Sequence, residues 1–171
     1  MCNDTYLSKA PQDETCLALA FLFAQLRSKD PNTKVGACVY DPKTGGMFLG
    51  YNGFPAGVPD LKVRWDCRDV LNDNCKYHYV VHAETNAVRK AMMALGRLDG
   101  CTLFVTHFPC RSCIKDAIIS SGLKKVVYWH DSHFDAVASK AAMEAGIELT
   151  PFGNAETRLS ALLNFAIARI Q

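Results

Sequence analysis

Two short motifs near the middle of the chain combine residue types that bind metal ions and transfer protons. The first holds His82 and Glu84, and the second holds Cys110 and Cys113 as a Cys-x-x-Cys pair. One imidazole and two thiolates are good ligands for Zn²⁺, and three protein ligands with an open fourth position are typical of a catalytic site. The sequence therefore predicts a zinc centre held by His82, Cys110 and Cys113.

Glu84 lies two residues after His82 and is not needed as a metal ligand. Zinc would lower the pKa of water in the open position to about 7, so hydroxide would be available at neutral pH. The Glu84 carboxylate could take a proton from that water and return it to a ring nitrogen and a leaving amine. We therefore predict that Glu84 is the catalytic residue.

Each motif alone has a less specific interpretation. A single Cys-x-x-Cys also occurs in structural zinc sites and redox pairs. A single His-x-Glu indicates nothing. In this order, however, His-x-Glu followed by Pro-Cys-x-x-Cys is the signature of zinc-dependent nucleobase deaminases.

The elements that must position these residues alternate between helices and strands. A dense apolar pattern predicts a helix over 13–29, buried on most sides, which Asp30-Pro31 ends. Two β-like runs flank a hairpin turn at 41–45 and predict an antiparallel pair. Helices are expected over 82–95, 110–121, 134–145 and 155–170, and strands over 34–40, 46–51, 101–108, 124–129 and 148–150.

This alternation predicts the α/β class, with a mixed sheet, a parallel portion and helices on both faces. Both motifs open helices, where the positive end of the helix dipole favours thiolates. We expect one domain over 1–171, with residues 1–12 flexible. The irregular segment 52–77 is longer than an idle loop normally is, which indicates a functional role.

Composition limits the class of protein and its partners. The chain has 171 residues, 49% of them hydrophobic, and a formal net charge of +2, which makes a large polyanion such as nucleic acid an unfavoured partner. Its longest apolar run, over 16–26, is about half of a membrane span. No secretory signal precedes the eight cysteines, so we expect free or metal-bound thiols and a cytoplasmic location.

Four blocks of the sequence resemble the deoxycytidylate (dCMP) deaminases: 27–37, 50–55, 82–87 and 106–113. The last two mark the whole cytidine and deoxycytidylate deaminase superfamily. The first two separate the enzymes that act on nucleotides from those that act on free nucleosides or tRNA. The resemblance implies a three-layer α/β/α fold with a mixed five-stranded sheet.

The same resemblance implies an activity and its regulation. Zinc-dependent hydrolysis would convert dCMP to dUMP and ammonia, supplying dUMP for dTMP synthesis. In these deaminases dCTP activates and dTTP inhibits, and the enzyme is an oligomer. We therefore expect a homo-oligomer, a hexamer, with dCTP and dTTP as effectors.

Several residues are candidates for contact with the substrate. The 5′-phosphate needs charge-assisted donors, which Arg27, Ser28 and Lys29 could supply, although basic residues also favour a solvated helix end. By resemblance, Asn52 would contact the sugar or base. Asn32 could do the same or serve as a turn residue. Phe108 could pack on the base or simply form a buried wall.

Segment 52–77 also carries candidates for an effector site. Lys62, Arg64 and Arg68 surround Trp65, a combination that could pair with phosphates and stack on a base. The alternative is an exposed connector with scattered charges. The segment leads directly to the helix that bears His82.

The remaining cysteines and histidines have simpler interpretations. Cys16, Cys38 and Cys101 lie in apolar runs and are expected in the core. Strand alternation is expected to turn His107 away from the metal motif, and surface positions are expected for His130 and His133. A second, structural zinc site could be formed by His78, Cys67 and Cys75.

Three alternatives to dCMP hydrolysis remain at this point. The same zinc chemistry serves deaminases that act on a base flipped out of a polynucleotide. A few basic side chains could equally bind the triphosphate dCTP. A deaminase fold could also persist as a non-catalytic, zinc-stabilised module, although such a module would not need Glu84.

Overall fold

A mixed five-stranded sheet forms the centre of the computed structural model, which describes residues 11–167. Its strands follow the order β2–β1–β3–β4–β5. β1 is antiparallel to both β2 and β3, whereas β3, β4 and β5 are parallel. The bounds are β1 (Gly36–Tyr40), β2 (Met47–Tyr51), β3 (Thr102–His107), β4 (Lys125–His130) and β5 (Glu148–Pro151). The predicted α/β class and antiparallel pair are confirmed.

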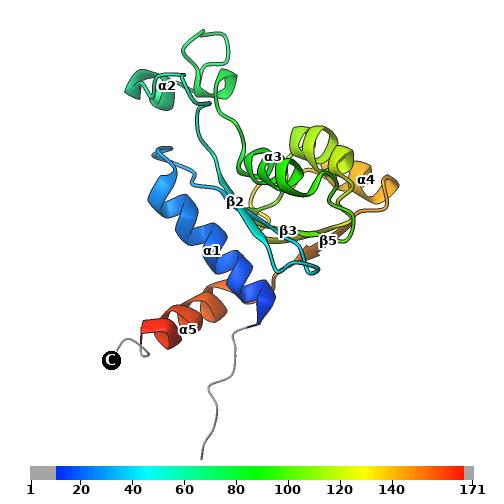
Figure 1. Cartoon of the computed structure of the whole chain (residues 1–171). Coiled ribbons are helices and arrows are strands. Elements are labelled where there is room, and N and C mark those ends of the chain that lie inside the picture. Colours follow the sequence, from blue (N-terminus) through cyan, green and yellow to red (C-terminus); the bar gives the residue numbers. More distant parts are fainter. Residues whose placement is uncertain (1–10, 168–171) are drawn as a thin grey trace, which may run out of the picture.

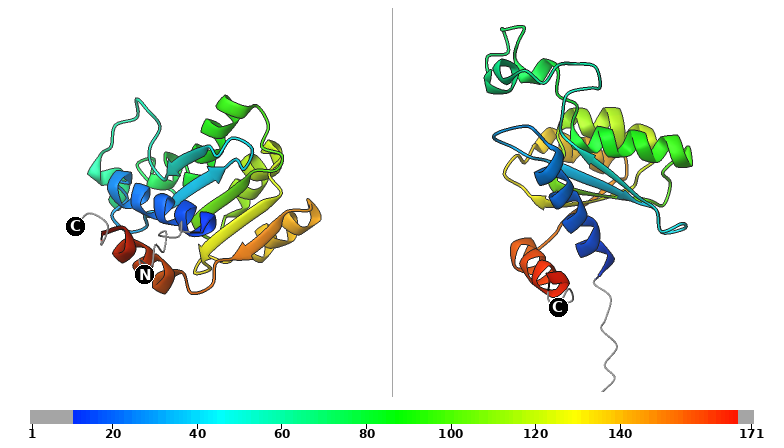
Figure 2. Two further views of the ribbon diagram at one scale, coloured as in Figure 1. Left: turned by 60° about the horizontal axis from the view of Figure 1, so that its bottom comes forward. Right: turned by 60° about the vertical axis from the view of Figure 1, so that its left-hand side comes forward.

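Helices cover both faces of this sheet, as Figures 1 and 2 show. On one face lies α1 (Gln12–Arg27), with α5 (Ala155–Ile167) beside it. On the other lie α3 (Ala83–Leu95), η2 (Cys113–Ile119) and α4 (Ala136–Glu144). This is the expected three-layer α/β/α arrangement. The flexibility expected for residues 1–12 falls mostly outside the described residues, and Gln12 already belongs to α1.

The expectation that the first helix is buried on most sides is wrong. Cys16, Leu17 and Ala20 pack on the sheet, but the Leu26 side chain is 79% exposed. The helix packs on the sheet along one face and also contacts α5, and its outer face exposes Leu22 and Leu26. Two glycines set how closely helices approach the sheet, because a Cβ on Gly36 would collide with α1 and one on Gly50 with α3.

The segment between β2 and α3 extends beyond the end of the sheet (Figures 1 and 2). It was predicted as irregular, and it contains two short helices, α2 (Lys62–Asp66) and η1 (Lys76–His78). An isolated bridge between Gly53 and Val81 closes its base. Within residues 11–167, no helix has the length and apolar character needed to cross a bilayer.

Candidate metal centre and substrate cavity

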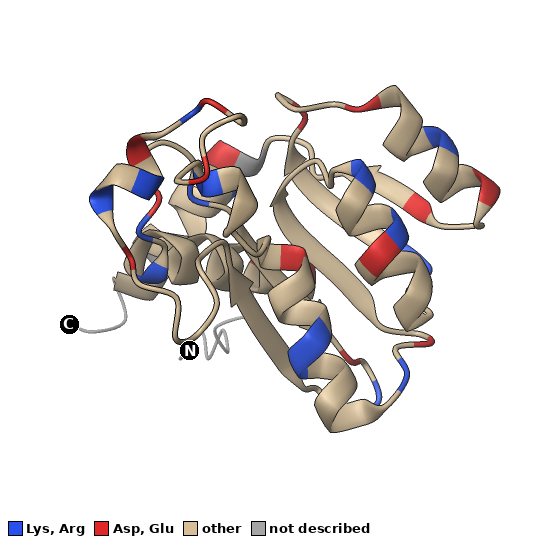
Figure 3. Cartoon of the chain, turned by 90° about the horizontal axis from the view of Figure 1, so that it is seen from above, with Lys and Arg blue, Asp and Glu red and all other residues tan. Residues whose placement is uncertain are grey.

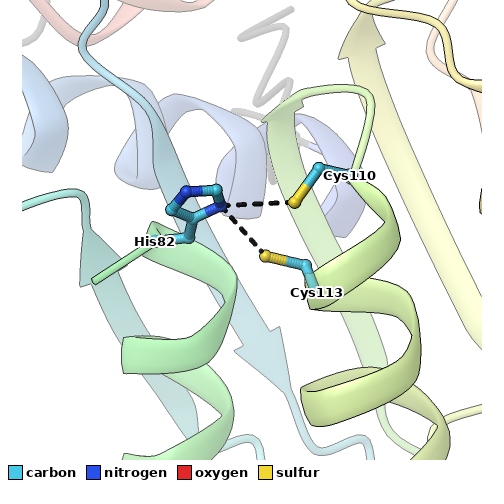
Figure 4. Close-up of side chains that lie close together, drawn as sticks. All are labelled: His82, Cys110 and Cys113. Carbon is cyan, nitrogen blue, oxygen red and sulfur yellow. Dashed lines mark hydrogen bonds between the residues drawn. The ribbon is translucent and has the colours of Figure 1, made fainter. Parts of the chain in front are cut away.

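The structure brings together the three predicted metal ligands (Figure 4). His82 is the residue before α3, and Cys110 directly precedes the helical turn that continues into η2. The Nδ1 atom of His82 lies 3.4 Å from Cys110 Sγ and 3.3 Å from Cys113 Sγ. η2 has π-helical hydrogen bonding, a feature found frequently at functional sites.

This donor set fits a zinc ion. Zinc binds sulfur at about 2.3 Å and nitrogen at about 2.0 Å, and a tetrahedral angle then separates the donor atoms by about 3.5 Å. The observed separations of 3.3 and 3.4 Å are close to that value. Among residues 11–167, this is the only group of three or more His, Cys, Asp or Glu ligand atoms close enough to share one ion. With three protein ligands, a fourth position is left for water or substrate.

The two thiols of this group differ in acidity. Hydrogen bonds from Cys113, His82 and Ser112 lower the pKa of Cys110 to about 3, despite the opposing effect of burial. The pKa of Cys113 is raised, because its proton is shared with the Cys110 thiolate and its sulfur is buried. A bound cation would displace this shared proton and hold both residues as thiolates.

Glu84 lies in the first turn of α3, beside the ligands but outside their cluster. Its side chain is buried, and burial raises the pKa of its carboxyl group. A carboxyl group with a raised pKa holds a proton more readily than an exposed one. This is the property expected of a residue that accepts a proton and then returns it.

A cavity of about 300 Å³ opens beside the ligands. Its walls come from the α1–β1 connection, segment 52–81, the start of α3 and the ends of β3 and β4. The lining residues are Asp30, Thr33, Val35, Asn52, Arg68, Lys76, Tyr77, Val80, His82, Ala83, Glu84, His107, Phe108, Cys110 and His133. The volume lies at the lower end of the range for small-molecule sites, about 300–1,000 Å³.

Two predicted substrate contacts, Asn52 and Phe108, line this cavity. Phe108 packs edge-on against Tyr128, with ring centroids 5.0 Å apart, so it is also a wall residue. The Asn52 amide is occupied within the protein. Its Oδ1 accepts hydrogen bonds from Ser28 and the Val35 amide, and its Nδ2 donates to Thr33 and Asp30. Asn52 therefore organises the cavity wall.

A buried ion pair joins the segment between β2 and α3 to the opposite wall. Lys76 Nζ lies 2.6 Å from Asp30 Oδ2, and both side chains are at most 5% exposed. Burial raises the pKa of Asp30, but hydrogen bonds from Lys76, Asn32 and Thr33 outweigh it and hold the pKa below its ordinary value. The sequence carried no signal for this pair, because its members are 46 residues apart.

The residues predicted to bind the substrate phosphate do not line this cavity. Arg27, Ser28 and Lys29 line a second cavity, of about 330 Å³, between the end of α1 and segment 52–65. Lys29 is paired there with Asp60 at 2.8 Å. Asn32 is exposed and also lies outside the catalytic cavity. Its backbone N–H donates a hydrogen bond to Asp30 Oδ1 in a turn. Contact between these four residues and a substrate at the metal centre has no support in this arrangement.

The four predicted effector residues do not share one cavity: Trp65 and Arg68 line different cavities, and Lys62 and Arg64 line neither. Trp65 is 4% exposed, stacks on Phe54 at a centroid distance of 4.0 Å, and lines the second cavity. Arg64 packs over Tyr79. The Lys62 side chain is 88% exposed and pairs with Asp66 within α2. Arg68, by contrast, lines the catalytic cavity.

The expectations for His107 and His130 need correction. His107 was expected to turn away from the metal motif, but it lines the catalytic cavity. His133 is exposed, as expected, and also lines this cavity. His107 lies on the same face of β3 as Leu103 and Val105, which pack towards α3 and η2, the elements beside the metal ligands. His130 is half-buried and does not line this cavity.

The second structural zinc site is not formed. Cys75 Sγ lies 3.6 Å from the Cys67 carbonyl oxygen, so those two residues are neighbours. His78 Nε2 instead lies 3.0 Å from the carbonyl oxygen of Val70. The three residues make no cluster of ligand atoms in the described part of the chain.

Comparison with known proteins places these features in one family. Residues 10–130 match the cytidine and deoxycytidylate deaminase zinc-binding region. The deoxycytidylate deaminases of Homo sapiens and Mus musculus are each 40% identical over 129 residues, covering 75% of this chain and 70% of theirs. A dCMP deaminase from the cyanophage S-TIM5, solved in complex with dCMP and dUMP, superposes with a TM-score of 0.67. The two sequences are 31% identical, and the superposition covers 85% of this chain and 100% of the cyanophage chain.

Proposed function

Because the chain belongs to the cytidine and deoxycytidylate deaminase family, we propose that it hydrolyses dCMP to dUMP and ammonia with zinc as cofactor. The observation that carries this function is the cluster of His82, Cys110 and Cys113, with the buried carboxyl group of Glu84 beside it in one cavity. Zinc bound by these ligands supplies an activated water at neutral pH, because it lowers the pKa of water.

Glu84 performs the proton transfers of this reaction. It accepts one proton from the attacking water as the oxygen bonds to C4 of the cytosine ring, and passes it to the ring nitrogen N3. It then takes the second proton from the new C4 hydroxyl group and gives it to the exocyclic amine, whose bond to C4 breaks as ammonia leaves and the C4 carbonyl forms. Because Glu84 is buried, its proton passes between reacting groups rather than into bulk water.

The cavity favours a mononucleotide over the larger substrates. A volume of about 300 Å³ accommodates a base, a sugar and one phosphate more readily than a triphosphate or a strand. Positive and negative residues are interspersed over the described part of the chain in the view of Figure 3, and no basic stripe of the kind that tracks a polynucleotide stands out there. A non-catalytic module would have no use for Glu84.

A substrate panel tests this function. We expect wild-type protein to turn over dCMP faster than cytidine, deoxycytidine, CMP, dCTP or a short cytosine-containing oligonucleotide. Uracil product and ammonia should appear in equal amounts. Preference for the oligonucleotide would support an editing-type deaminase instead, and inactivity on every compound with zinc bound would support the non-catalytic module.

The proposal extends to regulation by dCTP and dTTP at the second cavity. Arg27, Lys29 and Lys34 provide positive charge there, and Tyr51 and Trp65 provide aromatic surface. This combination suits a nucleotide with several phosphates.

A hydrogen-bonded chain connects the two cavities. Ser28 lines the second cavity, and its Oγ lies 2.8 Å from Asn52 Oδ1. Asn52 lines the catalytic cavity and contacts Asp30, which holds Lys76. An effector that moved the end of α1 would therefore act on the catalytic wall through Asn52.

We expect a homo-oligomer, a hexamer, with sigmoidal dCMP kinetics that dCTP makes more hyperbolic and dTTP opposes. A coupling free energy of about 1–3 kcal/mol changes apparent affinity by about 5–150-fold. Saturation curves with and without each triphosphate, combined with light scattering, measure both properties. A monomer with hyperbolic kinetics that ignores both triphosphates would contradict the regulatory proposal and leave the catalytic one intact.

A cytoplasmic location is proposed on chemical grounds. Cys110 and Cys113 must remain thiolates to bind zinc, and reducing compartments preserve them.

A further inference from the structure

Two histidines at the ends of the parallel strands form one wall of the catalytic cavity. His107 is the last residue of β3, and His133 follows the end of β4. Their rings stack with centroids 5.9 Å apart. The ring of His130 is tilted against that of His107, with centroids 5.3 Å apart, but His130 does not line the cavity. Ligands of α/β proteins bind beyond the carboxyl ends of parallel strands, which is where this wall stands.

A buried hydroxyl group sets the tautomer of His107. Thr106 is 2% exposed, and its Oγ1 accepts a hydrogen bond from the Gly36 amide at 3.1 Å. The same oxygen lies 3.0 Å from His107 Nδ1. A buried O–H group needs an acceptor, and Nδ1 is the one that lies beside it. Thr106 therefore donates to Nδ1, and the proton of the neutral ring is on Nε2.

His107 is a neutral hydrogen-bond donor. Burial lowers its pKa to about 4, and the neighbouring His130 and His133 contribute to the same shift. At neutral pH the ring thus offers one N–H group, at Nε2, and no other polar partner of this atom is found among the described residues. A substrate that enters the cavity supplies the acceptor for this donor.

Among residues 11–167, one cationic side chain that lines the cavity has no carboxylate partner. Of the two cationic residues that line the cavity in residues 11–167, Lys76 is paired with Asp30. Arg68 has no carboxylate partner there, and its Nη1 lies 3.5 Å from Tyr77 Oη. Arg68 therefore keeps its guanidinium group available for an anion.

We propose that Arg68, His107 and His133 bind the 5′-phosphate of the nucleotide in the catalytic cavity that they line. The inference rests on the proposed function, since the metal centre must hold the base for the phosphate to reach these residues. It replaces the phosphate contacts expected from Arg27, Ser28 and Lys29, which line the other cavity. A phosphate group can accept hydrogen bonds from the Arg68 guanidinium and from the His107 Nε2–H group.

Variants of Arg68 and His107 test this assignment. Arg68→Gln and His107→Leu should each lower kcat/KM for dCMP about ten- to a hundredfold, chiefly through KM, since a charged hydrogen bond is lost. Activity on deoxycytidine, which has no phosphate, should change by less than about threefold in both. His107→Gln restores an N–H donor and should recover most of the loss of His107→Leu.

The controls separate recognition from folding. Arg97→Gln removes an exposed arginine that pairs with Asp99 and does not line the cavity, so both activities should stay at wild-type levels. Calorimetric affinities for dUMP and deoxyuridine give the same comparison without turnover. Equal losses with nucleotide and nucleoside, in rates or in affinities, would overturn the inference, because they indicate a structural role.

The tautomer provides an independent measurement. Nitrogen-15 chemical shifts of His107 should report a protonated Nε2 and an unprotonated Nδ1 in free wild-type protein. The opposite tautomer would remove the donor on which the inference depends. If wild-type protein failed to turn over dCMP yet bound dUMP through Arg68, the proposed function would fail while the phosphate site stood.

Discussion

The Glu84→Gln variant is expected to keep stoichiometric zinc and a wild-type fold but to lose about 10²–10⁴-fold in kcat for dCMP. Glutamine has nearly the same shape as glutamate and cannot accept and return a proton in its place. Glu84 is not among the three clustered ligand atoms, so the metal keeps its protein ligands. The measurements are steady-state rates, zinc content by elemental analysis and a thermal melt.

A neutral side chain at this position also removes a buried ionisable group. The side chain is 4% exposed, and burial raises the pKa of its carboxyl group, so the amide should be tolerated at least as well as the acid. Loss of activity should therefore occur without loss of stability. This separation distinguishes a catalytic role from a structural one.

The matched control is Glu144→Gln, which changes an exposed residue of α4 that pairs with Lys140. Its rate should remain within about twofold of wild type, as expected for a surface substitution. If Glu84→Gln retained more than about a tenth of the wild-type rate, another group would have to carry the proton.

The metal centre was predictable from the sequence because its geometry is local. Each motif spans few residues and lies where a helix begins, so the positions of His82, Cys110 and Cys113 follow from where α3 and η2 start. The alternation of strands and helices indicated the sheet for a similar reason. For the sheet, the periodicity of the apolar residues reports which side of each strand or helix faces the core.

The substrate wall was less predictable because it depends on contacts between distant segments. Arg68 was assigned to an effector site and lies in the catalytic cavity, in a segment that the Lys76–Asp30 pair ties to the connection between α1 and β1. Asn52 and Gly50 belong to a block read as nucleotide recognition. In the structure, Asn52 organises a hydrogen-bond network, and Gly50 allows α3 to pack closely on β2.

His107 illustrates how a correct pattern led to a wrong expectation. Side chains do alternate along β3, with Phe104 packing towards α1 and Val105 towards α3. The error concerned which face the metal motif occupies after the strand ends. Only the packing of η2 beside α3 places the motif and His107 on the same face.

Removal of a thiolate is expected to abolish activity by a different route. Cys110→Ala and Cys113→Ala each leave two protein ligands where a catalytic zinc has three. We expect each variant to be purified with much less than one zinc per chain and to lack measurable dCMP turnover. Excess zinc should not rescue either variant, whereas chelator-treated wild-type protein should recover when zinc is returned.

Cys67→Ala is the informative control for the two ligand variants. Cys67 lies beside Cys75 in segment 52–81, outside the ligand cluster, so its removal should leave one zinc per chain and full activity. Zinc loss in this variant would show that the segment binds metal after all. A Cys113→Ala protein that still held one tightly bound zinc, while Cys67→Ala lost it, would place the ion elsewhere and contradict the assignment of His82, Cys110 and Cys113.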